Sequence, residues 1–452
     1  MSDKTIVSNE EMVEKDRRLL WHHMTPYQEN SGAMIVDKAK GAWIEDLDGN
    51  RFLDAMAGLW CVNAGYGRTE LAEAAYEQLK KMPFYPLTQS HLPAIRLADQ
   101  LNKWLGEEYR FSFSNSGSEA NETAFKIARQ YHYQNGDQGR YKVISRYRAY
   151  HGTTLGALSA TGQPQRKYRY EPLVPGFTHV TAPDSYRVPE EHTEESWSKH
   201  CANEIEQTIR WERPETVAAV IMEPIITGGG VLMPHPSYLK EVEIICKKYG
   251  VLLIIDEVIC GFGRTGKPFT FQHYDISPDI VTMAKGITSA YLPLSATAMK
   301  PYLFEVFKET GENDHFRHVN TFGGHPAACE VAIKNLEIME KESLVEQSNV
   351  QGTKLRTQLE PLLRHPLVGD IRQKGLLLGI ELVEDKKTKV PAAPEVIADL
   401  MKRCKQKGLI VGKNSDTVSG YQNVIALSPP LSITDEDVNF IATTLKQVFS
   451  IE

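Results

Sequence analysis

The feature that most constrains the fold is a pair of short apolar segments, each of which ends in a charged residue. Residues 251–255 are an unbroken apolar run of strand-forming side chains, followed at once by Asp256 and Glu257. Such a run suits a strand buried on both faces, as in a parallel sheet covered by helices. A second apolar segment, residues 279–284, ends in Lys285. The two segments predict an α/β fold with a mostly parallel central sheet.

The charged residues at these strand ends indicate one kind of chemistry. In open α/β sheets, ligands bind beyond the carboxyl ends of the strands, and a lysine is rarely buried unless it is paired or reactive. A lysine and an aspartate there suit pyridoxal phosphate, because Lys285 can form a Schiff base and Asp256 can keep the pyridine nitrogen protonated. The alternative is that Asp256 caps a loop and that Lys285 extends into solvent.

The same stretch also contains a pattern that points elsewhere. Residues 261–266 match G-x-G-x-x-G and follow a predicted strand, but the dinucleotide-binding form of this pattern must also open a helix. Residues 267–271 read KPFTF and form helices poorly. We therefore expect no nicotinamide cofactor.

Length and composition exclude several classes of protein. A chain of 452 residues is expected to form two or three domains. A net charge of −7 provides no basic surface, so nucleic acid is not an expected partner. No signal peptide is visible at the polar N-terminus, and no apolar run approaches a membrane span. The six widely spaced cysteines are typical of reduced thiols in a cytoplasmic protein, and neither they nor the histidines have metal-site spacing.

Further polar groups follow other predicted strands. Residues 115–118 lie between a strand at 110–113 and a helix at 119–134, where free N–H groups and the helix dipole can bind an anion; Ser118 as an ordinary N-cap is the alternative. Tyr150 and His151 follow the strand at 141–145 and could face a flat ring, although loop aromatics usually just pack.

Two more segments complete the set of site candidates. Glu223 ends a strand at 217–222. Trp60 lies in a glycine-rich segment, 58–67, that we expect to be a loop, and a tryptophan is more often part of a core than of a binding site.

The chain divides by its patterning into three parts. Residues 1–60 contain a hairpin signal at Asp48-Gly49 but none of the strand–helix rhythm that follows, so they are interpreted as an accessory segment that joins the small domain. Residues 61–326 form the large cofactor-binding domain, within which 162–200 are expected to be long loops. Residues 327–452 are expected to form a smaller α/β domain.

In order and spacing, these motifs resemble those of the class III (omega) aminotransferases, pyridoxal phosphate enzymes of fold type I. The resemblance covers nearly the whole chain. The segments that carry it are 115–120 (NSGSEA), 150–152 (YHG), 223–224 (EP), 256–258 (DEV), 261–266 (GFGRTG), 284–286 (AKG) and 321–322 (TF).

The resemblance implies a role for each matching residue. Lys285 would form the Schiff base and carry the proton, and Asp256 would bind the pyridine nitrogen. Val258 and Tyr150 would pack on the two faces of the ring, with His151 nearby.

The same resemblance implies how the phosphate is held. Ser116, Gly117 and Ser118 would bind it together with Thr321 of a neighbouring subunit, so that a homodimer, or a dimer of dimers, is expected. Glu223 is similar to a glutamate that lies close to the cofactor in this family.

The substrate pocket is less completely matched. Trp60, Tyr85 and Tyr150 resemble the aromatic pocket of the amine:pyruvate transaminases. Those enzymes have an arginine shortly after a Gly-Leu-Ile segment, where this chain has Lys413, so Lys413, Arg166 and Arg148 are the candidates for binding the carboxylate of the acceptor.

The sequence thus predicts an aminotransferase that moves an amino group from a primary amine or omega-amino acid to a keto acid, with pyruvate expected, by a ping-pong mechanism. The alternatives are a diamine or diamino-acid aminotransferase, for example of the adenosylmethionine-8-amino-7-oxononanoate type, and a racemase or aminomutase on the same scaffold. A non-catalytic cofactor-binding protein is disfavoured because Lys285 is present.

Overall fold

A computed structural model of the chain describes residues 9–26, 33–308, 311–414, 418 and 420–451. The α-helices are α1 (Asn9–Leu19), α2 (Ala57–Trp60), α3 (Thr69–Lys81), α4 (Leu92–Leu105), α5 (Gly117–Gln134), α6 (Leu155–Ala160), α7 (Pro164–Lys167), α8 (Glu194–Trp211), α9 (Tyr238–Tyr249), α10 (Pro301–Glu305), α11 (Pro326–Lys341), α12 (Leu344–Leu359), α13 (Pro394–Gln406) and α14 (Asp435–Val448).

Short 3₁₀ turns separate several of these elements. They are η1 (Pro214–Thr216), η2 (Thr270–His273), η3 (Lys285–Ile287), η4 (Val306–Lys308) and η5 (Glu360–Arg364).

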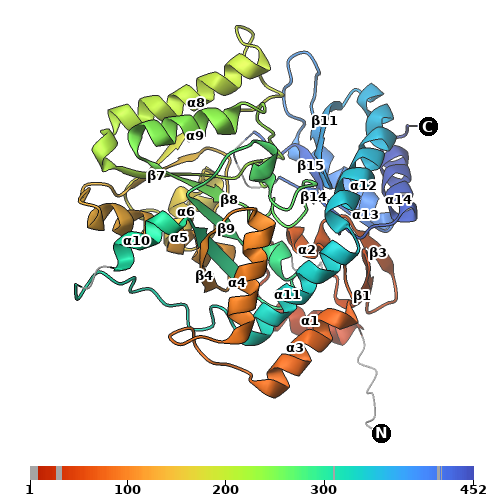
Figure 1. Cartoon of the computed structure of the whole chain (residues 1–452). Coiled ribbons are helices and arrows are strands. Elements are labelled where there is room, and N and C mark those ends of the chain that lie inside the picture. Colours follow the sequence, from red (N-terminus) through yellow and green to blue (C-terminus); the bar gives the residue numbers. More distant parts are fainter. Residues whose placement is uncertain (1–8, 27–32, 309–310, 415–417, 419, 452) are drawn as a thin grey trace.

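A seven-stranded sheet forms the centre of the molecule (Figure 1), in the order β4-β10-β9-β8-β7-β5-β6. Its strand β10 is antiparallel to both of its neighbours, and the pairs among the remaining strands are parallel. The prediction of a mostly parallel sheet is therefore confirmed. The strands are β4 (Arg110–Ser114), β5 (Lys142–Arg146), β6 (Phe177–Val180), β7 (Val217–Met222), β8 (Leu252–Asp256), β9 (Ile280–Met283) and β10 (Ser295–Met299).

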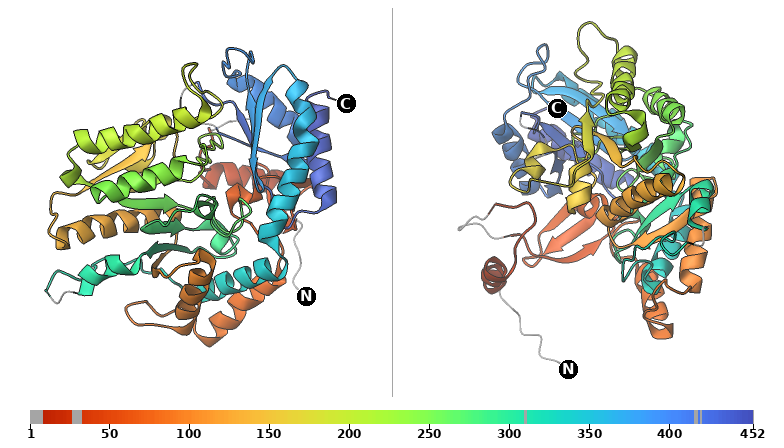
Figure 2. Two further views of the ribbon diagram at one scale, coloured as in Figure 1. Left: turned by 45° about the horizontal axis from the view of Figure 1, so that its top comes forward. Right: turned by 90° about the vertical axis from the view of Figure 1, so that its left-hand side faces the viewer.

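Helices cover both faces of this sheet, which explains why its middle strands are apolar throughout. Alternate side chains of a strand point to opposite faces. In β8, Leu253 and Ile255 belong to the core cluster that includes α9, whereas Leu252 and Ile254 belong to the cluster that includes α5. Figure 2 shows the resulting layers, with α8 and α9 on one side of the sheet and α5 on the other.

Two smaller sheets lie beside the central one. The first has the order β1-β2-β3-β13 and the second the order β11-β12-β15-β14. Their strands are β1 (Val36–Lys40), β2 (Trp43–Asp46), β3 (Arg51–Asp54), β11 (Val368–Lys374), β12 (Leu377–Leu382), β13 (Leu409–Ile410), β14 (Gly412–Lys413) and β15 (Val424–Leu427).

The predicted hairpin at Asp48-Gly49 is present as β2 and β3. Leu409 in β13 pairs in parallel with Leu53 in β3, so the hairpin lies against the C-terminal part of the chain. The division into 1–60, 61–326 and 327–452 stays a proposal.

Two expectations about loops need correction. Residues 162–200 are not simply long loops, because they contain α7, β6 and the first turns of α8. The glycine-rich segment at 58–67 begins with part of α2, a turn in which Gly58, Leu59 and Trp60 have left-handed backbone angles. This turn has helix-type backbone hydrogen bonds, but its backbone angles are not those of an α-helix.

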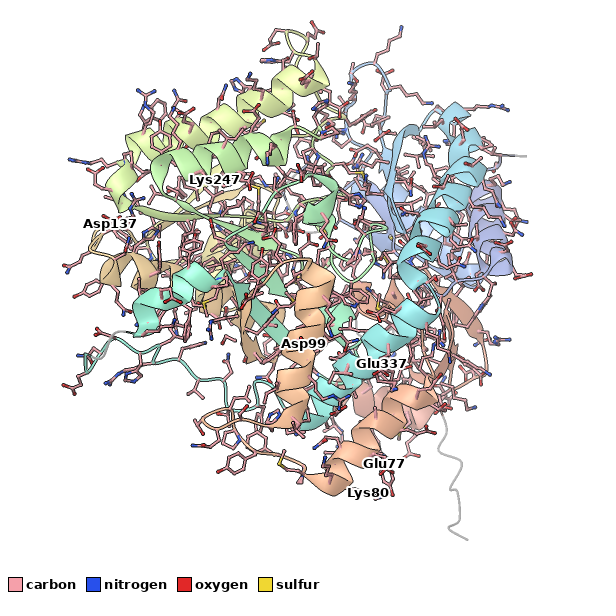
Figure 3. All side chains as sticks on the ribbon, viewed as in Figure 1. Glu77, Lys80, Asp99, Asp137, Lys247 and Glu337 are labelled. Carbon is pink, nitrogen blue, oxygen red and sulfur yellow. The ribbon has the colours of Figure 1, made fainter. Side chains whose placement is uncertain are left out.

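Charged side chains project outward from the surface helices, as Figure 3 shows for Glu77 in α3, Asp99 in α4, Lys247 in α9 and Glu337 in α11. Within the described part of the chain, no helix is both long enough and apolar enough to cross a bilayer.

Candidate active site

Asp256 lies buried at the carboxyl end of β8, with 3% of its surface exposed. Its Oδ2 accepts a hydrogen bond from Asn121 Nδ2 (2.8 Å) and lies 2.8 Å from His151 Nδ1. Its Oδ1 accepts a hydrogen bond from the backbone N–H of Val258 (3.0 Å). A carboxylate oxygen has two lone pairs, so Oδ1 can accept a second hydrogen bond from a ligand.

Asn121 links the parts of the site to one another, although the motif search did not single it out. This residue is buried near the N-terminal end of α5, where Nδ2 also donates to the backbone oxygen of His151 (2.6 Å) and Oδ1 accepts from the Thr282 hydroxyl (2.8 Å). One amide therefore connects α5 with the ends of β8 and β9. Its position on an apolar helix face was the available signal.

Lys285 follows β9 at the same edge of the sheet as Asp256. In the parallel pairing of β8 with β9, Asp256 lies opposite Thr282, and Lys285 begins the turn η3 soon after it. The positive charges of Lys285 and Arg264 act to lower the pKa of the Cys61 thiol, although burial has the larger effect and raises that pKa overall. Lys285 therefore lies close enough to Cys61, the residue after Trp60, for its charge to affect that thiol.

The predicted phosphate site is the first turn of α5. Ser116, rather than Ser118, is the N-cap of this helix: its Oγ accepts a hydrogen bond from the Glu119 N–H (3.3 Å). The Ser118 hydroxyl instead accepts one from the Thr153 N–H (3.0 Å). The next N–H groups along the turn, at Gly117 and Ser118, lack partners one turn earlier in the helix and can bind an anion.

Gly117 also brings Val258 into the site. A Cβ atom on Gly117 would lie 2.9 Å from Val258 Cγ1, so a side chain at position 117 would force Val258 to move. The phosphate turn and the residue expected to pack on the cofactor ring are therefore in direct contact.

Glu223 fixes the backbone of the opposite wall. Its Oε1 accepts a hydrogen bond from the Tyr150 N–H (3.0 Å), and its Oε2 accepts from the N–H and the hydroxyl of Thr227 (3.0 and 2.7 Å). Burial raises the pKa of this carboxyl group. Glu223 therefore positions the Tyr150 loop.

Arg166 lies against the ring of Tyr150. Its Cζ is 4.8 Å from the ring centroid, and its Nε donates to Gln163 Oε1 (2.6 Å). Arg166 belongs to the short helix α7, within the segment 162–200 that was expected to consist of long loops. A guanidinium on one face of Tyr150 leaves the other face for a cofactor ring.

The remaining candidates lie further out or have other partners. Arg148 is buried and forms an ion pair with Asp184 (2.7 Å). Lys413 is exposed in β14, Tyr85 is half exposed between α3 and α4, and Thr321 lies in an exposed turn before α11.

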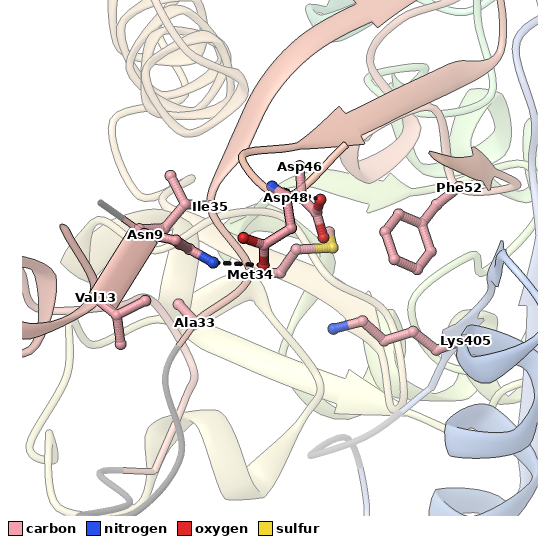
Figure 4. A pocket seen from close by; sticks show the side chains of 9 residues that line it. All are labelled: Asn9, Val13, Ala33, Met34, Ile35, Asp46, Asp48, Phe52 and Lys405. Atoms are coloured by element: carbon pink, nitrogen blue, oxygen red, sulfur yellow. Dashed lines mark hydrogen bonds between the residues drawn. The ribbon is translucent and has the colours of Figure 1, made fainter. Parts of the chain in front are cut away.

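Trp60 is partly buried against an apolar cluster, and its Nε1 has no hydrogen-bond partner among the described residues. The surface pocket of about 340 Å³ in Figure 4, which includes Asp46 and Lys405, contains none of these site candidates.

Comparisons with known proteins agree with this geometry. The family model described as "Aminotransferase class-III" matches residues 25–449. The "uncharacterized aminotransferase YhxA" of Bacillus subtilis is 62% identical over 450 residues, covering 99% of each chain. The "taurine–pyruvate aminotransferase" of Bilophila wadsworthia is 40% identical over 444 residues, covering 97% of each.

Solved structures give the same result. A Bacillus anthracis aminotransferase superposes with a TM-score of 0.96 at 56% identity and covers 100% of this chain and 99% of that one. The omega-transaminase of Pseudomonas jessenii in complex with PMP superposes with a TM-score of 0.93 at 35% identity and covers 97% of each chain.

The site fits the cofactor of this family. The buried carboxylate of Asp256 can accept a hydrogen bond from a protonated ring nitrogen. Gly117 has no side chain, so Val258 packs closely beside the turn that can bind an anion. Family, fold and site geometry agree: the chain belongs to the class-III aminotransferases, enzymes that depend on pyridoxal 5′-phosphate.

Proposed function

We propose that this aminotransferase is an omega-transaminase that moves an amino group from a primary amine or omega-amino acid to pyruvate. Three features support the proposal: the partly buried Trp60, the Tyr150 ring with Arg166 against it, and the likeness to a taurine–pyruvate aminotransferase. The contact between Arg166 and Tyr150 is the observation that carries most of the argument.

Each residue of the site has a task in this reaction. The bound cofactor supplies an aldehyde that can be linked to an amine and a protonated ring that accepts electrons. Lys285 would hold the cofactor covalently, and its Nζ would carry the proton. Asp256 keeps the ring nitrogen protonated, and Asn121 and His151 keep Asp256 in place.

Arg166 is the proposed partner of the acceptor carboxylate. One pocket must admit both a keto acid and an amine that can lack a carboxylate, and a fixed buried cation would be left unpaired by the amine. Arg166 is only partly buried, and without substrate its guanidinium makes a cation–π contact with the Tyr150 ring. It can therefore serve one substrate without being left unpaired by the other, and Lys413 is the second choice.

We also propose that the enzyme acts as a homodimer. Thr321 lies in an exposed turn whose neighbours Val319 and Phe322 are 72% and 59% exposed, and Phe322 packs on Phe84 at a ring separation of 5.7 Å. Clustered exposed apolar side chains are typical of an interface, and a second copy would bring Thr321 to the phosphate of its partner.

The six free cysteines, five of them buried, support a cytoplasmic location.

The second half-reaction tests the acceptor. The enzyme is first converted to its amine-loaded form with a primary amine, and its return is then followed by absorbance with pyruvate or with 2-oxoglutarate. We expect faster return with pyruvate, because the second carboxylate of 2-oxoglutarate would be stranded among aromatic side chains. Faster return with 2-oxoglutarate would reject pyruvate as the acceptor.

The same assay tests Arg166. Loss of a hydrogen bond to a charged group should raise the KM for pyruvate roughly 10- to 100-fold in Arg166→Ala. Arg169→Ala is the matched control, because Arg169 also lies over a tyrosine, Tyr168, but on the exposed side of this segment. An unchanged KM for pyruvate in Arg166→Ala would remove Arg166 from the site.

A further inference from the structure

The turn that carries Lys285 has an unusual backbone. Lys285, Ser289 and Ala290 have φ angles of 47°, 48° and 64°, and none of them is glycine. Left-handed backbone at such residues persists only where the surrounding structure holds it in place, and it is concentrated at functional sites. The contacts that hold this turn therefore bear on where the lysine amine lies.

Asn335, in the middle of α11, holds the turn from one side. Its side chain is fully buried, and its Nδ2 donates to the backbone oxygens of Gly286 (2.9 Å) and Ile287 (3.1 Å). Its Oδ1 accepts a hydrogen bond from the Ser289 hydroxyl (2.7 Å), whose oxygen accepts one from the Ala64 N–H (2.9 Å). Both donors and the acceptor of this amide thus act on residues 286–289.

Asn63 packs against the same turn. It is 1% exposed, its Nδ2 donates to the Phe262 oxygen (2.8 Å), and its Oδ1 accepts from Arg264 Nη2 (2.8 Å). A Cβ atom on Gly286 would lie 2.5 Å from Asn63 Nδ2, so this amide packs directly on the backbone next to Lys285. Asn63 also belongs to the segment that follows Trp60.

The neighbours of Asn335 show that an amide is not needed for packing there. Val331, Ala332, Leu336 and Met339 in the same helix are buried apolar residues. A buried amide is costly unless its hydrogen bonds are satisfied. Apart from a weak contact of Nδ2 with Met339 Sδ (3.7 Å), the hydrogen bonds of the Asn335 amide go to the turn after Lys285. An apolar side chain could fill the same space but could not hold two backbone carbonyls.

We propose that Asn335 and Asn63 are positioning residues for Lys285, which fix the strained turn so that Nζ returns to the same place in each catalytic cycle. The inference rests on the proposed role of Lys285 as the lysine that binds the cofactor. Lys285 would release the cofactor in the first half-reaction and take it back in the second, so a misplaced backbone at this turn should slow turnover. Neither asparagine is expected to touch the substrate.

The test compares two buried asparagines in the holoenzyme. Asn335→Ala removes the side-chain hydrogen bonds between Asn335 and the turn. Asn423→Ala is the matched control, because Asn423 is also fully buried and donates to a backbone oxygen, that of Leu382 (2.6 Å), but lies just before β15 of the C-terminal sheet. The readouts are Tm, kcat, KM for the amine, and the fraction of bound cofactor that borohydride fixes to Lys285.

Both variants should lose thermal stability to a similar extent. We expect Asn335→Ala alone to lower kcat about 10- to 100-fold, the scale for a small misplacement of a reacting group, with KM for the amine nearly unchanged and a smaller fixed fraction. Ser289→Ala is a milder second variant, should Asn335→Ala not fold, and is expected to change the same quantities less.

Three results would decide the matter. A kcat and fixed fraction in Asn335→Ala or Ser289→Ala equal to those of Asn423→Ala would overturn the inference while leaving Lys285 as the cofactor-binding lysine. Label on another lysine in the unsubstituted enzyme would reject the proposed function and this inference together. A loss of kcat and fixed fraction confined to the Asn335 and Ser289 variants would support both.

Discussion

Two neighbouring carboxyl groups at the end of β8 have opposite surroundings. Asp256 is held by Asn121, His151 and the backbone of Val258, which are all hydrogen-bond donors. Glu257 is fully buried, and its Oε1 accepts a hydrogen bond from the Phe271 N–H (2.7 Å). Burial raises the pKa of Glu257 to about 8, so this group is mostly protonated at neutral pH.

This raised pKa predicts a pH dependence of stability. The folded enzyme keeps the Glu257 proton up to a pH of about 8, whereas the unfolded chain releases it near the usual 4.5. The folded state therefore binds more protons in this window, and the contribution of Glu257 to stability, complete below pH 4.5, falls as the pH rises to 8.

Glu257→Gln is the variant that checks this prediction. A glutamine can still accept the hydrogen bond from Phe271 but does not titrate. Between pH 5 and 8, the Tm of the unsubstituted enzyme should fall relative to that of the variant. The underlying loss in the free energy of unfolding is at most about 1.4 kcal/mol per pH unit. Parallel Tm curves for the two proteins would contradict the assignment.

The sequence indicated the charged residues of the candidate site but not the amides that contact them. Asp256 and Lys285 stand out because they end apolar strands at a known ligand-binding edge. Asn121, Asn63 and Asn335 belong to no motif, and Asn121 lies 135 residues from Asp256. Such contacts depend on how distant segments pack, which a single sequence does not reveal.

Among the elements, the first turn of α5 has the most direct consequence for binding. Ser116 caps this helix, and Thr193 caps α8 through a capping box of the same kind. Ser116→Ala and Thr193→Ala should each cost about 0.5–2 kcal/mol of stability through loss of the cap. Only Ser116→Ala should also weaken phosphate binding, raising the Kd for pyridoxal phosphate roughly 10- to 100-fold.

Titration of the two apo variants with pyridoxal phosphate measures this difference. Thr193→Ala serves as the control for loss of a helix cap far from the site. Equal cofactor affinities in the two variants would show that Ser116 is only a cap.

Elements whose side chains follow one regular apolar pattern were predicted well. Elements in which that pattern is interrupted were missed. The apolar runs of β7, β8 and β9 gave bounds within two residues of those observed. β11 was missed because its register shifts between Val368 and Asp370, which breaks the alternation of buried and exposed positions. β6 and α7 were missed because proline, tyrosine and charged residues dominate their surroundings.

For the whole molecule, the proposed homodimer makes a prediction. Phe322→Asp should place a charge in the interface and shift sedimentation toward the monomer, with loss of activity because Thr321 no longer reaches the partner. Trp211→Asp is the control, since Trp211 is 76% exposed on α8 and lies outside the proposed interface. A fully active monomer of the Phe322 variant would contradict the shared site.

The arrangement of the three parts was only partly predictable at this scale. A parallel sheet follows from apolar strands separated by helices, but the pairing of β3 with β13 joins segments from opposite ends of the chain. The first 60 residues gave no signal for that partner beyond their hairpin, because β13 is only two residues long.

The most direct test of the account is chemical mapping of the lysine that binds the cofactor. The holoenzyme is reduced with borohydride, digested, and the labelled peptide identified by mass spectrometry. The account predicts label on Lys285, with Lys285→Ala still binding pyridoxal phosphate through the α5 turn but failing to transfer an amino group. Label on any other lysine, or amino transfer at the normal rate by Lys285→Ala, would contradict it.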